Sequence, residues 1–432
     1  MATFSSTLLR ERGGRTIFNK GNIMTIIKVQ KGTKDILPSD MPVWHFMEEK
    51  ANEVFSKYGA KEIRTPIFEA TELFARGVGD TTDIVNKEMY TFEKSERSLT
   101  LRPENTAGVV RSFIENGMHR LSAPVKLWYK GPMFRYERPQ AGRQRQFHQV
   151  GVEVFGIKQA TADAEVILMA VNYLQALGLN DLSVELNSLG CPACREVFKT
   201  KLKAVLKPYL SQLCPDCQAR YEKNPLRLLD CKVEECKEIY AKPEIQTVIQ
   251  SDFICEECSS HFEELKGYLD NLGVNYSINK LLVRGLDYYN RTVFEIKSNN
   301  LGSQNAVCGG GRYDSLVKNL GGEDTPAIGF AMGMERLASL IGEKHEERLK
   351  AFVVCNNPIE AIKLTEELRS QGVTCEFDLT NKKFVKQLEK ASKVAKYALI
   401  LGEDEITTGQ VTVKNLETSE QKTVNRGSNY FI

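Results

Sequence analysis

An arginine and a carboxylate stand two residues apart at Arg135 and Glu137, directly after a predicted extended segment. Side chains two apart on a strand project to the same face, so one can bind a phosphate while the other accepts hydrogen bonds. The residues that follow, 138–146, include several arginines and would suit a polyanion. A solvated hairpin tip is the alternative interpretation of the same stretch.

Another candidate anion site lies at residues 329–337, where a glycine-containing strand pattern runs into a helix pattern. Arg336 would lie near the start of that helix, where backbone N–H groups are available to a phosphate. The same pattern is also compatible with a packing role, so by itself it does not define a site.

Eight of the eleven cysteines are concentrated in one part of the chain. Three pairs are separated by two residues and one pair by four: Cys191 and Cys194, Cys214 and Cys217, Cys255 and Cys258, and the wider pair Cys231 and Cys236. These thiolates suffice for two tetrahedral structural zinc sites, and the four pairs can be combined in three ways. Free or partly oxidised thiols and a redox function are the alternatives.

The composition bounds the class of protein. A length of 432 residues indicates two or three domains, and 42% hydrophobic with 26% charged residues excludes a disordered or fibrous chain. The formal charge is only +2, so a nucleic acid must be bound by local basic patches. Apolar runs are far shorter than the ~18 residues of a membrane span, which predicts a soluble protein. Without a secretory signal pattern, the cysteines favour a reducing compartment, and we expect a cytoplasmic protein.

Periodicity then predicts the elements that must position these residues. Helices are expected at 43–58 and 162–177, and extended segments at 63–68, 125–136, 281–296 and parts of 302–340. We predict an unstructured extension at 1–24 and a mixed α and β domain at 25–343, with an inserted helical domain at about 190–272. Strands alternating with helices predict a C-terminal α/β domain at 349–432 with a largely parallel sheet.

Taken together, three segments resemble the motifs of the class II aminoacyl-tRNA synthetases, in that family's order. Pro66 matches the proline of motif 1, residues 134–137 match motif 2, and residues 329–337 match motif 3. Segments 282–289 and 308–314 resemble the two histidine-specific motifs of histidyl-tRNA synthetase. The resemblance spans about residues 31–422 and implies an antiparallel-sheet catalytic domain followed by an anticodon-binding domain. A P-loop glycine-lysine signature is absent from the sequence, as expected for this class.

The resemblance implies a histidine–tRNA ligase, which forms histidyl-adenylate from ATP and histidine and then esterifies the 3′ end of histidine tRNA. By motif, Arg135 would contact the α-phosphate of ATP, Arg336 the γ-phosphate, and Glu137 the adenine end. Arg284 would place a fixed cation beside the α-phosphate, and Mg²⁺ would bridge the other phosphates. Immobile guanidinium groups stabilise the charge that develops when a carboxylate attacks phosphorus.

The resemblance also implies how histidine is recognised. Its ammonium would be bound by Glu104, Thr106 and Gln149, its two ring nitrogens by Glu153 and Tyr289, and Tyr288 would line the pocket. A pocket that pairs a polar group with each side of the imidazole rejects analogues that leave those groups unpaired. Without the neighbouring Arg284 and Asp287, the two tyrosines would more simply be core aromatics.

For the tRNA, Gln140 and Arg145 match positions that meet the acceptor end. Lys383, Lys386, Lys390 and Lys393 recur at helical spacing in the last domain, either as a solubilising surface or as part of its contact with the anticodon stem. Motif 1 builds the subunit interface in this family, which implies a homodimer.

Two noncatalytic alternatives share the expected fold: the regulatory paralogue of ATP phosphoribosyltransferase, and an RNA-binding sensor with a degenerate synthetase domain. Either would carry Arg135, Glu137, Arg284 and Arg336 without a use for them, so both rank behind the ligase.

Overall fold

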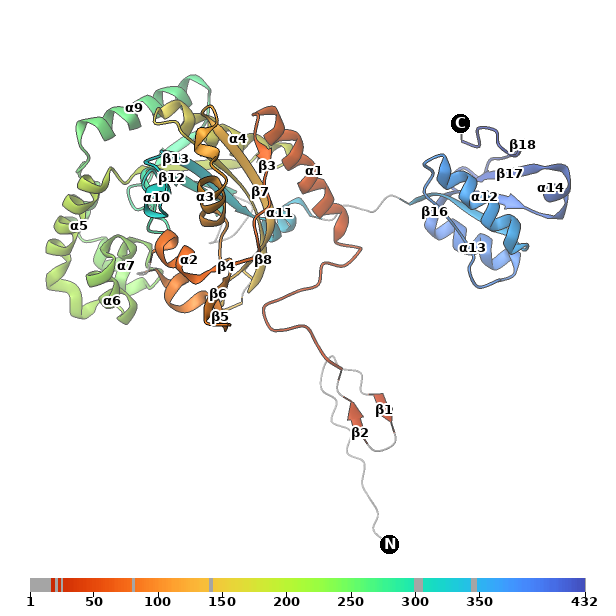
Figure 1. The fold of residues 1–432 in the computed structure, drawn as a ribbon, viewed down its shortest axis with the longest axis horizontal. Coiled ribbons are helices and arrows are strands. Elements are labelled where there is room, and N and C mark those ends of the chain that lie inside the picture. The colour runs from red at the N-terminus through yellow and green to blue at the C-terminus, as the bar shows by residue number, and fades with distance from the viewer. Residues whose placement is uncertain are drawn as a thin grey trace, which may run out of the picture. The chain divides into compact units, whose positions relative to one another are not determined.

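The structure is a computed structural model that describes residues 17–19, 22–24, 26–79, 82–139, 143–298, 306–342 and 348–431. It divides into two compact units, Met1–Lys344 and His345–Ile432 (Figure 1). Within the extension expected to be unstructured, strands β1 (Ile17–Asn19) and β2 (Asn22–Met24) pair as a short antiparallel hairpin. Most of the predicted charged linker, residues 343–347, lies outside the described residues.

Among the described residues of the first unit, an eight-stranded sheet forms the centre, in the order β10-β9-β11-β12-β13-β8-β7-β3. In that order the strands are Tyr276–Ile278, Leu182–Ser188, Asn290–Ser298, Ala306–Arg312, Ala327–Gly333, Gln146–Phe155, Val125–Phe134 and Lys61–Glu62. The pairs from β9 to β7 are antiparallel, and both edge pairs are parallel. The predicted mixed fold with an antiparallel central sheet is confirmed.

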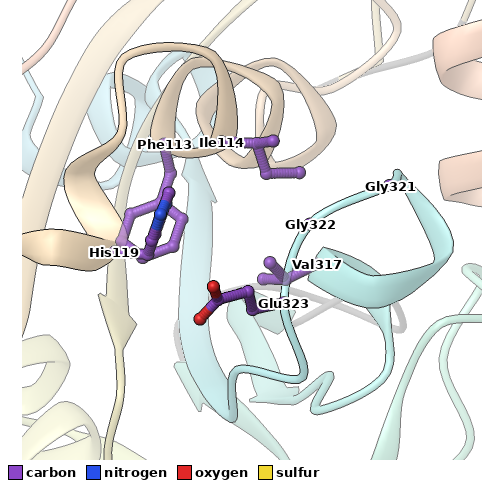
Figure 2. Close-up of a pocket in the computed structure, with 7 residues that line it drawn as sticks. All are labelled: Phe113, Ile114, His119, Val317, Gly321, Gly322 and Glu323. Atoms are coloured by element: carbon purple, nitrogen blue, oxygen red, sulfur yellow. The ribbon is translucent and has the colours of Figure 1, made fainter.

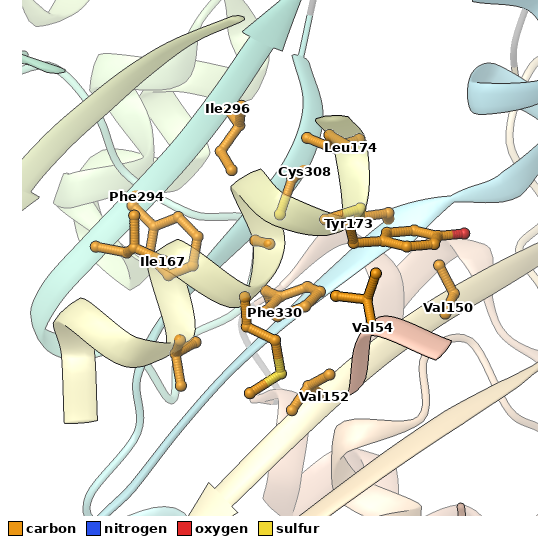
Figure 3. Close-up of a cluster of buried hydrophobic side chains, with 14 of the residues drawn as sticks. Val54, Val150, Val152, Ile167, Tyr173, Leu174, Phe294, Ile296, Cys308 and Phe330 are labelled. Carbon is orange, nitrogen blue, oxygen red and sulfur yellow. The ribbon is translucent and has the colours of Figure 1, made fainter. Parts of the chain in front are cut away.

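One face of this sheet is apolar, because side chains alternate along each strand. Val150 and Val152 of β8 and Phe330 of β13 point to this face and belong to the main core (Figure 3). Helices α1 (Met41–Lys57), α4 (Ala160–Ala176) and α11 (Met334–Ile341) supply the residues that cover it. The first two coincide, within two residues, with the helices predicted from the sequence.

A buried ionic network ties helix α9 (Glu256–Asn271) and helix α4 to strand β12. The guanidinium of Arg312, fully buried, bonds Asp163 of α4 at 2.6 Å. His261 of α9 lies 2.8 Å from the other carboxylate oxygen of Asp163. Burial opposes the charge of Asp163, but His261 and Arg312 together hold the pKa of this carboxyl below its ordinary value. Such a network is costly to break, because a lost partner leaves a buried charge unpaired.

The opposite face of the sheet is partly covered by helix α3 (Thr106–Glu115), whose Val109, Val110 and Phe113 pack on it. Smaller elements complete this side of the unit: α2 (Thr71–Val78), η1 (Ile84–Glu88), η2 (Met118–Arg120), α10 (Leu316–Asn319) and the three-stranded sheet β4-β6-β5 (Phe68–Ala70, Arg97–Leu101, Tyr90–Lys94).

The cysteine-rich insertion is helical, as predicted (Figure 1). It has its own apolar core. Its elements are α5 (Pro192–Leu206), η3 (Lys207–Gln212), α6 (Pro215–Lys223), η4 (Pro225–Asp230), α7 (Glu234–Tyr240), α8 (Pro243–Gln250) and α9. Between α9 and strand β11 only β10 is extended, because residues 281–289 form a loop. The predicted extended segment 281–296 is therefore confirmed for 290–296, which lie in β11, and wrong for 281–289. Insertion side chains, instead of a neighbouring strand, bond several carbonyls of this loop.

Among its described residues, the second unit contains a five-stranded sheet in the order β15-β14-β16-β17-β18. The strands in that order are Cys375–Phe377, Leu349–Cys355, Ala395–Leu401, Gln410–Asn415 and Gln421–Asn425, and the helices are α12 (Pro358–Ser370), α13 (Phe384–Val394) and α14 (Glu403–Thr408). The first three strands are parallel, as predicted, and the last two are antiparallel. Across the described part of the chain, the helices are too short or too polar to cross a membrane.

Candidate active site

The face of the central sheet opposite the main core is here called the site face. One row of paired residues crosses strands β12, β13 and β8 and consists of Gly311, Gly329 and Glu153. Four residues further along β13 from Gly329, Gly333 pairs with Gln149 of β8. Because side chains alternate along a strand, Gln149 and Glu153 project to the same face. The register therefore places two predicted histidine-binding residues beside a floor that carries almost no side chains.

Two glycines on the site face leave room for functional side chains. A Cβ on Gly329 would lie 1.9 Å from Glu153 Oε2, and a Cβ on Gly309 would lie 1.8 Å from Arg284 Nη2. Both separations are far shorter than van der Waals contact. Glycine at these positions is thus what allows the carboxylate and the guanidinium to lie against the sheet.

Glu153 is buried on the site face and bonded on both oxygens. Its Oε1 accepts a hydrogen bond from Thr106 Oγ1 at 2.7 Å, and its Oε2 accepts one from the hydroxyl of Tyr313. Burial is the main cause that raises the pKa of Glu153 to about 8, with the charge of Glu104 acting in the same direction. The hydrogen bonds oppose this rise, so a ligand that donates to Glu153 would favour its ionised form.

Glu104 lies two residues before helix α3 and accepts hydrogen bonds from the first two backbone N–H groups of that helix. Thr106 N donates to Oε2 at 2.7 Å and Ala107 N donates to Oε1 at 2.9 Å. Burial raises the pKa of Glu104, while these N–H groups stabilise its charge. The helix start therefore fixes the orientation of this carboxylate next to Thr106.

Aromatic rings form a wall beside Glu153. The ring of Tyr288 lies 4.6 Å from that of Tyr289 and 5.6 Å from that of Tyr313, measured between centroids. Burial raises the pKa of Tyr289 to about 12, so its hydroxyl keeps its proton at neutral pH.

The side-chain oxygen of Gln149, Oε1, is buried without a hydrogen-bond partner among the residues that the structure describes. An unsatisfied buried acceptor of this kind favours a ligand that donates a hydrogen bond.

Arg284 lies in the loop 284–289 and is held by an ion pair with strand β11. Its Nη1 lies 2.8 Å from Glu295 Oε1, and both side chains are about one-fifth exposed. Its Nε is buried and has no acceptor within the described ranges of the chain. The guanidinium is therefore fixed in place while retaining a donor for a ligand.

Arg135 and Glu137 lie just beyond the end of β7, directly after an extended segment as predicted, so the strand geometry expected to align their side chains does not apply. A tight turn, in which Glu137 N bonds Arg135 O at 2.8 Å, still brings the two side chains to 3.9 Å. Arg135 Nε donates to Pro103 O at 2.8 Å, and its guanidinium lies 5.3 Å from the ring centroid of Phe147. These contacts orient the arginine beside the segment that carries Glu104.

Arg336, in the first turn of α11, donates a hydrogen bond to the carbonyl of Ala306. Burial and the nearby charge of Arg143 lower the pKa of Arg336, whereas the carboxylates of Glu295 and Glu137 act in the opposite direction. Glu295 forms an ion pair with Arg284 and Glu137 lies 3.9 Å from Arg135, so the carboxylates whose charge acts on Arg336 are the partners of the other two arginines. The structure thus brings Arg135, Arg284 and Arg336 to the border of the site face.

The predicted tRNA-contact residues are only partly described. Arg145 stacks its guanidinium 3.8 Å from the ring centroid of Tyr136 and donates to the carbonyls of Glu137 and Lys31. Gln140 lies outside the described residues. In the second unit, Lys386 and Lys390 of α13 approach Glu389 and Glu376, at 2.7 and 3.5 Å.

The eight clustered cysteines form two groups of four, which resolves the three combinations left open by the sequence. Cluster A comprises Cys191, Cys194, Cys255 and Cys258, and cluster B comprises Cys214, Cys217, Cys231 and Cys236. Within each cluster all sulfur atoms lie within 4.8 Å of one another, and every cysteine is a free thiol in the described structure. Backbone N–H groups of Cys191 and Cys255 donate to sulfurs of cluster A, and that of Cys214 to cluster B, at 3.1 to 3.2 Å.

A pocket of about 260 Å³ lies elsewhere, between α3 and the segment after α10 (Figure 2). Phe113, His119 and Glu323 are among its lining residues, and Figure 2 shows them with the glycines at 321 and 322. The arginines and carboxylates described above do not line it. We assign no role to this pocket.

Sequence reasoning assigned no role to several residues that the structure places in the site. Tyr313 bonds Glu153, Glu295 pairs with Arg284, and Arg143 lies 3.3 Å from Glu137. Tyr313 stands in the segment 308–314 that resembles a histidine-specific motif, which was a usable signal. Glu295 carries no such local signal, because its role depends on the pairing of β11 with β12.

An antiparallel sheet with a glycine floor, bordered by arginines from three separate segments and by a helix start, is the catalytic domain of a class II aminoacyl-tRNA synthetase. Family models match the chain as histidyl-tRNA synthetase over residues 32–198 and 232–337, and as an anticodon binding domain over residues 350–428. The chain therefore belongs to the histidyl-tRNA synthetase family, and the resemblance inferred from the motifs is confirmed.

Individual proteins agree with this assignment. A histidine–tRNA ligase of Acetivibrio thermocellus is 50% identical over 409 residues, which cover 92% of this chain and 97% of that protein. The crystal structure of apo histidyl-tRNA synthetase from S. aureus matches with a TM-score of 0.76 and 38% identity, over 93% of this chain and 97% of that one. A Bacillus halodurans structure, described as an ATP phosphoribosyltransferase regulatory subunit/histidyl-tRNA synthetase, matches 85% of this chain and 97% of its own at 22% identity and a TM-score of 0.60, and shows the shared fold alone.

Proposed function

We propose that this chain activates histidine with ATP and transfers it to histidine tRNA, as a histidine–tRNA ligase. The observation that carries the proposal is the placement of Arg135, Arg284 and Arg336 around the same face that holds Glu153 and Gln149. Cations for a triphosphate and polar groups for an amino acid thus adjoin one another. The noncatalytic alternatives are not favoured, because they give these arginines no task.

In the first step a carboxylate oxygen of histidine attacks the α-phosphorus of ATP. The new P–O bond forms the adenylate, the bond to the β-phosphate oxygen breaks, and pyrophosphate leaves. In the second step a terminal hydroxyl of the tRNA attacks the carbonyl carbon, and AMP leaves with the bonding pair. Negative charge increases at the α-phosphate in the first step, so fixed cations there lower the barrier.

Each arginine receives a position along the triphosphate in this proposal. Arg284 and Arg135 bind the α-phosphate, Arg336 binds the γ-phosphate, and Glu137 contacts the adenine end. MgATP is the substrate form, since Mg²⁺ neutralises the β- and γ-phosphates. The ion pair of Arg284 with Glu295 supports the role of Arg284 at the α-phosphate. A guanidinium that is already oriented needs little reorganisation when negative charge develops beside it.

Histidine is read at both ends. The ammonium of histidine is bound by Glu104, Thr106 and Gln149. The buried oxygen of Gln149, which has no hydrogen-bond partner among the described residues, can accept a hydrogen bond from an ammonium N–H. Glu153 and Tyr289 bind the two ring nitrogens, and Tyr288 packs against the ring. The bond from Tyr313 to Glu153 fixes the carboxylate against the sheet, which restricts the position of an imidazole that donates to it.

Binding of tRNA is proposed to involve two regions. Gln140 and Arg145 contact the acceptor end, and the second unit, which matches the anticodon binding domain, contacts the anticodon stem. The cation stack of Arg145 on Tyr136 supports a role in binding a phosphate or a base. Lys383, Lys386, Lys390 and Lys393 of the α13 region supply positive charge on the second unit.

Each cysteine cluster is proposed to bind one structural zinc ion. Zn–S bonds of about 2.3 Å in a tetrahedron place the sulfurs about 3.8 Å apart. The contacts of 3.5 Å in cluster A, between Cys191 and Cys194, and 3.9 Å in cluster B, between Cys214 and Cys231, fit that donor set. Backbone N–H groups aimed at the sulfurs would stabilise thiolates around the metal.

A homodimer in the cytoplasm is the proposed working form. Pro66 lies in the segment between β3 and β4, and the next residues, Ile67 and Phe68, are apolar and about half exposed. Apolar side chains at such a position suit a subunit interface. The cytoplasmic assignment follows from the free thiols and from the substrates, tRNA and ATP.

The test is histidine-dependent exchange of labelled pyrophosphate into ATP by the purified chain without tRNA. We expect exchange with histidine and at most 1% of that rate with the other amino acids. Aminoacylation of histidine tRNA should follow when tRNA is added. A folded protein without any exchange would contradict the proposal and favour a noncatalytic role.

The substitution Gly309→Ala is expected to lower the exchange rate roughly 10- to 100-fold, because the new Cβ displaces the guanidinium of Arg284. Gly267→Ala on helix α9 is the matched control, since a Cβ there meets no atom within 4 Å in the described part of the chain. Exchange rates of both variants at saturating ATP check the prediction. An unchanged exchange rate for Gly309→Ala would show that the reaction does not require the guanidinium of Arg284 to lie against Gly309.

A further inference from the structure

The loop 284–289 carries Arg284, Tyr288 and Tyr289, yet it has neither helix nor strand. Its shape must therefore be fixed by contacts from other parts of the molecule. Three of its residues, Gly285, Asp287 and Tyr289, accept hydrogen bonds from side chains of the helical insertion. Each of these donors stands next to, or between, the cysteines of one cluster.

From cluster A the donor is Arg195. Cys191 is the N-cap of α5 and Cys194 lies in its first turn, so Arg195 directly follows a cluster residue. Arg195 Nη1 lies 3.0 Å from Tyr289 O and 3.4 Å from Asp287 O. Gly190, one residue before the cluster, accepts a backbone bond from Arg291 at 2.9 Å. Cluster A is thus anchored to both sides of the end of the loop.

From cluster B the donors are Asn224 and Arg227. Both lie in the segment that joins Cys217 to Cys231, so two cysteine pairs of one cluster enclose them. Arg227 Nη1 donates to Gly285 O at 2.8 Å, and Asn224 Nδ2 donates to Asp287 Oδ1. The same segment is anchored to the catalytic domain, because Arg220 and Arg227 lie 2.6 and 3.5 Å from Asp83.

We infer that metal ions bound by the two cysteine clusters position the loop 284–289, and so set the affinity for histidine as well as bracing the insertion. The physical reason is that four repelling or protonated sulfurs hold a helix start poorly, whereas one Zn²⁺ fixes all four ligands. Without metal, the cap of α5 and the segment 217–231 relax, and their donors leave the loop carbonyls. The inference rests on the proposed function, since histidine binding is its readout.

The first experiment uses the full chain as purified, with zinc measured by elemental analysis. We expect two zinc ions per chain, and a rise of at least tenfold in the KM for histidine in pyrophosphate exchange after removal of zinc with a chelator. Adding Zn²⁺ back should restore the KM. A zinc-free chain as purified, or a metal-depleted chain with unchanged KM, would overturn the inference. Absence of exchange in the zinc-loaded chain would instead contradict the proposed function.

The second experiment separates positioning from stability. Arg195→Met should raise the KM for histidine roughly tenfold while the KM for ATP changes less than twofold and the zinc content stays at two. Arg195→Lys should restore part of the affinity, because lysine supplies a donor. Lys199→Ala, on the same helix and paired with the exposed Glu196, is the control with unchanged constants. Arg227→Met tests the donor of cluster B, and because Gly285 directly follows Arg284, this variant is expected to lower the exchange rate as well as to raise the KM for histidine. Two outcomes for Arg195→Met would contradict the role of Arg195 in positioning the loop. One is an equal change in the KM for histidine and the KM for ATP, and the other is a lowered Tm without a change in the KM for histidine.

Discussion

Replacing Arg284 by alanine is expected to lower histidine-dependent pyrophosphate exchange about 10³-fold while the chain remains folded. The guanidinium is held by Glu295 at 2.8 Å and keeps a buried Nε without an acceptor in the described structure, so its interaction with the α-phosphate is preorganised. Loss of one preorganised donor at the point where charge develops typically costs about 10²- to 10³-fold in rate, and a full cation costs more. Exchange rates at saturating histidine and ATP measure the effect.

Lys130→Ala is the matched control for Arg284→Ala. Lys130 forms an ion pair of similar exposure with Glu48, at 2.5 Å, but it pairs in register with Val150 and so lies on the core face of the same sheet. Its loss should leave exchange within threefold of the unmodified chain. If Arg284→Ala retains exchange, or if both variants lose it equally, Arg284 is not the cation at the α-phosphate. Thermal unfolding of both variants shows that a loss of rate is not a loss of fold.

Replacing Glu153 by glutamine is expected to raise the KM for histidine about 30- to 100-fold. The amide has nearly the same shape but cannot give a charged acceptor to a ring N–H, and charge-assisted hydrogen bonds are about twice as strong as neutral ones. Since the pKa of Glu153 is about 8 without histidine, binding should release a proton from this carboxyl. The KM of the unmodified chain should therefore fall as the pH rises from 7 to 8.5, and the variant should show a flatter profile. A steep profile that survives in Glu153→Gln would assign the titration to another group.

The same carboxyl makes a separate prediction for stability. Its folded pKa of about 8 exceeds the ordinary 4.5, so between these values the folded chain binds more protons than the unfolded chain. The free energy of unfolding must then fall as the pH rises through this window. Urea unfolding at pH 5.5 and 8 should show a smaller decline for Glu153→Gln than for the unmodified chain. Equal declines would mean that Glu153 titrates near its ordinary pKa.

The sequence predicts best those features whose signal is local. Strand β13 ends at Gly333 and helix α11 begins at Met334, within the segment 329–337 where the sequence predicted that a glycine-containing strand runs into a helix. The insertion is marked in the sequence by the concentration of cysteines between Cys191 and Cys258. The loop 284–289 was mistaken for part of a strand, because the apolar run from Leu281 to Val283 resembles one locally. The side chains that support this loop lie 58 to 94 positions earlier in the chain.

Features that depend on pairing could not be predicted in the same way. The packing of helices α5 and α9 decides which cysteine pairs form cluster A. The spacings within the four cysteine pairs do not contain that information. The bond from Tyr313 to Glu153 requires the register of β8, β13 and β12. Arg135 and Glu137 meet through a turn beyond β7, although the predicted reason was a shared strand face. The sequence identified Arg135 and Glu137 from the chemistry of their side chains, whereas the turn that brings them together is visible only in the fold.

The nearly bare floor of the site limits how this pocket could be redesigned. At Gly309, Gly311 and Gly329 there is no side chain left to trim, so enlarging the cavity for a bulkier amino acid cannot begin there. Adding even a methyl group at Gly309 or Gly329 collides with Arg284 or Glu153. Altered substrate choice must therefore come from the walls, by exchanging Tyr288, Tyr289 or Tyr313, while the floor stays as it is.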